Sequence, residues 1–228
     1  RDVGLAGLLF KALNSPLFGL RTRVNSVPQA VFALGTRNLR NIVTGLVLRS
    51  AVGGGASFER FWDSAERVAS INAHLCSLLP RAPRDAAYTL GLFRDCGIPI
   101  LMQRIPAYRD TLKAATTQQE SMTAIEDRAH QTNHAGVGHV VAKSWGLPPP
   151  ICAAILRHHD IELLDGGADA ETATLIAVNT LGEHLNDESQ RMREDGRWRQ
   201  HGGAILDYLG FSEIEYQELR EDVLNSLQ

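Results

Sequence analysis

The sequence has few of the features that mark secreted, membrane-spanning or strand-rich proteins. No apolar run in it approaches the roughly 18 to 20 residues that a helix needs to cross a bilayer. Its 3 cysteines lie far apart and include no C-x-x-C pair, so neither a disulfide framework nor a zinc knuckle is expected. Sustained period-2 alternation is also missing. These absences predict a helical protein without membrane insertion, and cysteines that stay free favour the cytoplasm.

Acidic residues are absent from Pro16 to Ser57, although the whole chain has a formal net charge of −3. The candidate binding residues of this basic stretch are Arg21, Arg23, Arg37 and Arg40. Such a stretch can face a nucleic acid, an acidic partner or the acidic C-terminal part of the same protein. The sequence leaves all three possibilities open.

Apolar residues recur at helical spacing along most of the chain, which predicts an all-α fold. Ser26 and Gln29 have the spacing of a capping box, and we expect the helix that they open to end at Gly35. Gly53-Gly54-Gly55 lacks side chains to pack and is predicted to be a hinge. We therefore expect an N-terminal helical subdomain over residues 1–55 and a larger helical domain over residues 56–228.

Six residues carry the chemistry that a buried site could use. In chain order they are Asp63, Asp95, His134, His158, His159 and Asn179. Helices that are separated in sequence can direct such side chains into one bundle core, where metal sites are often built.

The order of these residues resembles the HD superfamily of metal-dependent phosphohydrolases, and more closely its HDOD branch of bacterial signalling domains. The supporting segments are Asn14-Ser15-Pro16-Leu17-Phe18-Gly19, Ser26 to Gly35, Gly91-Leu92-Phe93-Arg94-Asp95-Cys96-Gly97, His134-x-x-x-Gly138, Trp145-Gly146-Leu147-Pro148 and His158-His159. The resemblance covers nearly the whole chain. It implies an HD-like helical bundle preceded by an N-terminal helical subdomain.

The sequence departs from an active family member at several positions. Such a member would have histidine where Asp63 stands, a His-Asp doublet where Arg94-Asp95 stands, and aspartate where Asn179 stands. Two-metal relatives have lysine where this chain has Ile98. The remaining donors are vestigial metal-ligand candidates, namely Asp95, His134, His158 and His159.

Physical arguments also weaken a catalytic site. The amide of Asn179 offers a neutral carbonyl, and Arg94 would bring a permanent positive charge unless its side chain turned to solvent. Consecutive residues of a helix point about 100° apart, so His158 and His159 would not easily share one ion. We expect no cofactor; if affinity persists, the ion would be divalent Fe, Mn or Zn.

Structural roles compete with these assignments. The three histidines could be core residues that hydrogen-bond to backbone or carboxylates, and Asp95 could pair with Arg94. Val27 to Arg49 could form a helix-turn-helix, but its second helix is largely apolar and the chain is negatively charged, which argues against a nucleic-acid partner.

The resemblance implies a non-catalytic regulatory module that acts through protein–protein interaction, with bacterial signalling proteins as partners. Two alternatives remain. One is a divergent metal-dependent phosphohydrolase or cyclic-dinucleotide phosphodiesterase, and the other is a nucleotide or nucleic-acid binder that uses the basic stretch.

Overall fold

The computed structural model describes residues 13–14, 23–51, 56–80, 82–115, 120–190 and 196–227, and it has helices but no strand within these ranges. The all-α prediction is confirmed. The elements are α2 (Val27–Ala51), α3 (Ala56–Leu78), α4 (Arg84–Phe93), α5 (Gly97–Arg104), α6 (Tyr108–Ala115), α7 (Met122–His130), α8 (His134–Ser144), α9 (Pro149–Arg157), the 3₁₀ helix η2 (Ile161–Asp165), α10 (Ala170–Ser189), α11 (Gly196–Leu209) and α12 (Glu213–Ser226). None of the described helices combines the length and the apolar character needed to cross a bilayer.

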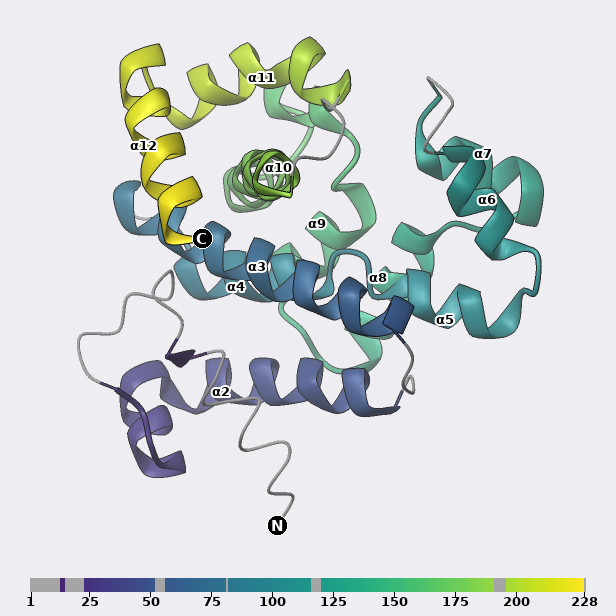
Figure 1. Ribbon diagram of the computed structural model, residues 1–228, viewed down its shortest axis with the longest axis horizontal. Coiled ribbons are helices and arrows are strands. Elements are labelled where there is room, and N and C mark those ends of the chain that lie inside the picture. The colour runs from purple at the N-terminus through teal and green to yellow at the C-terminus, as the bar shows by residue number, and fades with distance from the viewer. Residues whose placement is uncertain are drawn as a thin grey trace.

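The centre of the bundle is α10, which Figure 1 shows nearly end-on with other helices around it. It packs against α3, α4, α9, α11 and α12. Leu175, Ile176 and Val178 are fully buried on it, and so are Asn179 and Thr180. Thr180 donates its hydroxyl to Ile176 O (2.9 Å), whereas the buried Asn179 Nδ2 has no hydrogen-bond partner within the described residues.

The predicted break at Gly35 is confirmed. Within α2 this residue has φ +74° and ψ 160°, so the helix consists of two segments on either side of it. Positive φ favours glycine because a Cβ atom would clash with the backbone. Gln29 N donates to Ser26 Oγ (3.3 Å), as expected of the cap, while Gln29 Oε1 accepts from Asn25 N (2.8 Å).

The helix α2 lies along one side of the bundle and approaches α4 closely (Figure 1). A Cβ atom on Gly45 would lie 2.5 Å from Leu92 Cδ2 and 3.0 Å from Phe93 Cζ. Leu39 and Ile42 belong to the same buried hydrophobic cluster as the core residues of the helices that follow residue 55. The hinge glycines lie among residues 52–55, outside the described residues, so the boundary at residue 55 stays a prediction.

Helix ends position the candidate residues. Asn133 caps α8, with its Oδ1 accepting from Gly136 N (2.7 Å). The preceding helix, α7, begins at Met122, and Ser121 Oγ accepts from Ala124 N. Pro149 and Pro150 occupy the first turn of α9, which ends at Arg157.

Candidate functional site

Four polar side chains from three places in the fold converge inside the bundle. Asp95 lies in the turn between α4 and α5, His134 is the first residue of α8, and His158 and His159 follow the last residue of α9. His134 Nε2 lies 3.0 Å from His159 Nε2 and 3.4 Å from His158 Nε2. Asp95 Oδ1 lies 3.5 Å from His134 Nε2 and 3.4 Å from His158 Nε2. The four predicted ligand candidates therefore form one cluster.

The spacing of these donors fits a single divalent ion. Zinc–nitrogen bonds of about 2.0–2.1 Å place tetrahedral ligand atoms about 3.3 Å apart. The four separations given above, 3.0 to 3.5 Å, lie near that value, and the ligand atoms of His134, His158 and His159 all lie within 4.8 Å of one another. Three imidazoles form a donor set that Fe, Mn or Zn accepts, and Asp95 lies against two of them. The fit concerns one ion, since the described residues bring no further His, Cys, Asp or Glu group together at ligand spacing.

The expectation that His158 and His159 diverge is wrong. Their ring centroids lie 3.9 Å apart, and both rings face His134. The 100° rule holds only within a helix, and α9 ends at Arg157. His159 lies in the turn that follows, so its side chain takes a direction that helical geometry does not set.

His134 is held by a buried carboxylate, Glu126 of α7. Glu126 Oε2 accepts from His134 Nδ1 (2.7 Å) and from the backbone N of His134 (3.1 Å), while Tyr108 donates its hydroxyl to Oε1. Because Nδ1 donates, Nε2 presents its lone pair to the cluster. Burial alone would lower the pKa of His134, but its hydrogen bond to Glu126 and the charge of Asp95 raise it above the usual value.

His159 has the opposite kind of outer partner. Arg197 of α11 donates from Nη1 to His159 Nδ1 (2.9 Å). A guanidinium can only donate, so the proton of a neutral His159 must sit on Nε2, where it can donate to His134 Nε2. Burial and then the neighbouring cationic groups hold the pKa of His159 well below its usual value.

His158 completes the arrangement. Its Nδ1 lies 2.8 Å from the carbonyl oxygen of Ile155, which only accepts, so Nδ1 carries a proton and the neutral ring offers its Nε2 lone pair to the cluster. The lone pairs of His134 and His158 and the Asp95 carboxylate thus face the same point. A cation or an additional proton must balance this concentration of negative potential.

Arg94 does not turn to solvent. It is buried, and its Nε lies 2.5 Å from Glu183 Oε1 and 3.2 Å from Asp95 Oδ2, while Nη1 donates to Gly91 O. The predicted pairing of Asp95 with Arg94 is therefore present. Burial would raise the pKa of Asp95, but Arg94 and the protonated forms of His158 and His134 hold it well below its usual range. The positive charge of Arg94 thus neutralises part of the negative charge that would attract a metal ion to this cluster.

The other altered positions lie in different surroundings. Asn179 Oδ1 accepts from Asn72 Nδ2 (3.1 Å), so its carbonyl is engaged with α3. Asp63 and Ile98 line a groove that is described below. These residues do not supply a second set of donors, and the geometry does not fit a two-metal centre.

Sequence reasoning missed four residues of this site, namely Tyr108, Glu126, Glu183 and Arg197. Glu183 Oε2 accepts from Arg197 Nη2 (2.9 Å) and thereby links Arg197 to the Arg94 pair. No local pattern distinguishes these residues from ordinary helix positions.

The structure does not gather the basic candidates into a described site. Arg23 and Arg40 are exposed, Arg21 lies outside the described residues, and the side chain of Arg37 is not described. Their binding role stays a prediction.

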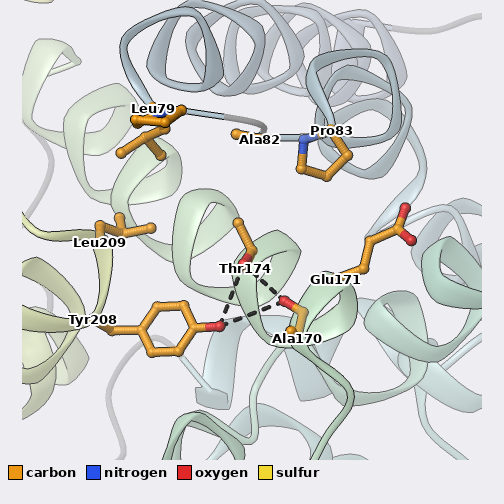
Figure 2. A pocket seen from close by; sticks show the side chains of 9 residues that line it. Leu79, Ala82, Pro83, Ala170, Glu171, Thr174, Tyr208 and Leu209 are labelled. Carbon is orange, nitrogen blue, oxygen red and sulfur yellow. Dashed lines mark hydrogen bonds between the residues drawn. The ribbon is translucent and has the colours of Figure 1, made fainter.

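A cavity of about 570 Å³ lies on another side of the bundle, between the connector from α3 to α4, the start of α10 and the end of α11. Figure 2 shows the hydroxyl of Tyr208 directed toward Ala170 and Thr174. It lies 3.3 Å from Thr174 Oγ1 and 3.5 Å from Ala170 O. The cavity contains none of the clustered donors, so we assign no chemistry to it.

Comparisons with known proteins agree with this architecture. An uncharacterized protein of Treponema pallidum is 26% identical over 171 residues, which cover 71% of this chain and 32% of that protein. This chain thus spans about a third of the relative's length. An HDOD domain protein of unknown function from Geobacter sulfurreducens has a TM-score of 0.71 at 22% identity, with 99% of this chain and 79% of that chain covered. The MmoQ response regulator of Methylococcus capsulatus has a TM-score of 0.57 at 22% identity, with 95% and 84% covered.

At these identities the two solved structures show a shared fold. The family model of the HDOD domain matches residues 1–161, which is more than half of the chain. The resemblance inferred from the ordered segments is confirmed, and this chain belongs to the HDOD domain family.

Proposed function

We propose that this chain is a non-catalytic regulatory module that acts in the bacterial cytoplasm through protein–protein interaction with signalling partners. The observation that supports this is Arg94, whose buried guanidinium pairs with Asp95 and Glu183 where an active relative would place a histidine ligand. The similarity of the fold to a response regulator agrees with a signalling role.

The catalytic role is opposed by charge as well as by missing ligands. Arg94 and Arg197 both contact Glu183, so two cations already lie beside the cluster. The hydrogen bond from Arg197 keeps a proton on His159 Nε2, where an ion would need a lone pair. These groups stabilise the cluster in a metal-free state.

The second candidate is a single-ion phosphohydrolase, and the convergence of Asp95, His134, His158 and His159 favours it. A divalent ion held there would act as a Lewis acid on a phosphoester. The chain would contribute the carboxylate and imidazoles, Glu126 would orient His134, and a position left open on the ion would admit the attacking water.

Metal analysis combined with activity separates the two candidates. The purified chain, loaded in turn with Fe(II), Mn(II) and Zn(II), is assayed against bis(p-nitrophenyl) phosphate and cyclic dinucleotides beside His134→Ala. The control is His139→Ala, because His139 Nδ1 contacts Cys152 O rather than the cluster. We expect no turnover above that of His134→Ala. Stoichiometric metal and turnover that are lost in His134→Ala but kept in His139→Ala would establish the enzyme instead.

A further inference from the structure

A groove of about 940 Å³ lies between α3, α5, α6, α7 and the end of α10. Figure 1 shows α6 and α7 set apart from the central helices, on the side where α3 begins and α5 lies. Its apolar lining comes from Phe61, Ile98, Met102, Leu112 and Met122. Each of these side chains is partly exposed, so the groove leaves apolar surface accessible to a partner.

Basic residues lie along two walls of this groove. Arg60 and Arg67 of α3 are seven positions apart, which places them on one helix face about 10 Å from each other. Arg109 and Lys113 of α6 are one helical turn apart, and Lys113 Nζ also lies 3.5 Å from the exposed Asp110 Oδ1 of the same helix. Within the described part of the chain, Arg60 and Arg109 form no ion pair.

Asn186 holds the guanidinium of Arg67 in place. The described lining of the groove contains little negative charge to balance its basic residues. Asn186 Oδ1 accepts from Arg67 Nε (3.0 Å), which holds the guanidinium against the groove wall. Among the lining residues that the structure describes, Asp63 is the one acidic residue. The groove therefore combines an apolar floor with an excess of positive charge.

The shape of this surface selects among the ways in which proteins bind segments of a partner. Strand addition needs an exposed sheet edge, and the described residues form no strand. Polyproline grooves are lined by several aromatic rings, whereas Phe61 is the aromatic residue of this lining. Phosphate sites need donors that converge on one point, but these cations are spread along two helices. The remaining binding mode is an amphipathic helix of the partner that lies in the groove. Flexible methionines such as Met102 and Met122 adapt well to such a ligand.

We propose that this groove docks an acidic amphipathic helix of two to three turns from a signalling partner. Apolar side chains at positions i, i+3 or i+4, and i+7 of that helix lie on the floor. Its flanking Asp and Glu side chains pair with Arg60 and Arg67 on one wall and with Arg109 and Lys113 on the other. This inference names the partner class of the proposed function and rests on it.

The test uses a display library of 14-residue helical peptides with randomised surface positions, selected against the wild-type chain. We expect the enriched peptides to combine a Leu, Ile or Met stripe with Asp or Glu on its flanks. By fluorescence anisotropy, an enriched peptide should bind Arg60→Glu/Arg109→Glu at least tenfold more weakly than the wild type. The matched control is Arg104→Glu/Lys143→Glu, which makes the same charge change at exposed positions outside the groove and should bind as the wild type does.

Three outcomes would overturn the proposal. One is that no peptide is enriched, or that the enriched peptides are neutral or basic. Another is equal weakening by both double variants. The third is that something else occupies the groove. This would be shown by a fluorescent nucleotide that binds there in competition with pyrophosphate, or by a dimer of the chain that dissociates in Arg60→Glu/Arg109→Glu. None of these results requires phosphodiesterase turnover, so failure of this inference is distinguishable from failure of the non-catalytic assignment.

Discussion

His134 and His159 are two buried imidazoles whose Nε2 atoms lie 3.0 Å apart, but their outer partners have opposite charge. Glu126 accepts from Nδ1 of His134 and raises its pKa, whereas Arg197 donates to Nδ1 of His159, whose pKa is held low by burial and nearby cations. The first ring offers a lone pair to the cluster and the second offers a proton. The partner behind each ring thus decides whether it resembles a metal ligand.

The comparison supports the proposal that this chain keeps the histidines of the family scaffold without keeping an ion. The proton of His159 Nε2 occupies the space between the rings and points at His134 Nε2. This hydrogen bond engages the lone pair of His134 Nε2 without an ion. A cluster of histidines is therefore weaker evidence for a metal than the sequence pattern indicates, unless the outer partners are carboxylates or carbonyls.

Removal of Glu126 should have the largest effect. Glu126→Ala leaves the His134 ring N–H, the His134 backbone N–H and the Tyr108 hydroxyl without their acceptor inside the protein. We expect a loss of about 3–5 kcal/mol in the free energy of unfolding, measured by urea denaturation. Glu126→Gln keeps one acceptor oxygen and should lose less than about 2 kcal/mol. Equal losses in the two variants would contradict the assigned role of the carboxylate charge.

The next effect should come from Gly97, which sets the distance between the Asp95 turn and His134. A Cβ atom on Gly97 would lie 2.1 Å from His134 O and 3.0 Å from Gly138 N. Since backbone atoms cannot yield as a side chain can, Gly97→Ala should destabilise the fold by about 3 kcal/mol. Gly136→Ala is the control, because its Cβ would meet only Asn133 Oδ1 at 3.3 Å. A loss of the same size in both variants would refute this account of the packing.

Replacement of Arg197 should allow His159 to offer a lone pair from Nε2, as His134 does, and so to bind a metal ion. Arg197→Gln removes the obligatory donor to His159 Nδ1 and one cation beside Glu183. We expect affinity for Co(II), followed by its visible absorption, to rise at least tenfold, or about 1.4 kcal/mol. Arg199→Gln, two residues further along α11, is the control and should leave affinity unchanged. An unchanged affinity in Arg197→Gln would show that Arg197 does not oppose the ion.

Features that depend on neighbouring residues could be predicted from the sequence. The Gly35 break, the Asn133 cap and the helical fold all follow from local spacing and the conformations that particular residues allow. The gathering of Asp95 with the three histidines could be predicted only from the family resemblance, because the chain separates them by up to 64 positions.

Pairings between distant residues could not be predicted. Arg94 meets Glu183 across 89 positions and His159 meets Arg197 across 38, with no periodic pattern that links either pair. The error about His158 and His159 had a different cause, since helical geometry was applied to residues that follow the last residue of α9. The chemistry of the cluster is decided by these tertiary contacts, so the sequence identified its donors but not their protonation.

The smallest predicted effect is the pH dependence of stability, in which the two histidines should act in opposite directions. The raised pKa of His134 adds stability that is complete below the unfolded value of about 6.5 and is lost as pH rises through the folded value. The lowered pKa of His159 means that unfolding takes up a proton below about pH 6.5, so this group destabilises the fold as pH falls. Each slope is at most about 1.4 kcal/mol per pH unit. In chelator-treated protein between pH 5 and 8, His134→Gln should flatten the alkaline side of the profile and His159→Gln the acid side; the same change in both variants would mean that Glu126 and Arg197 do not set the two rings apart.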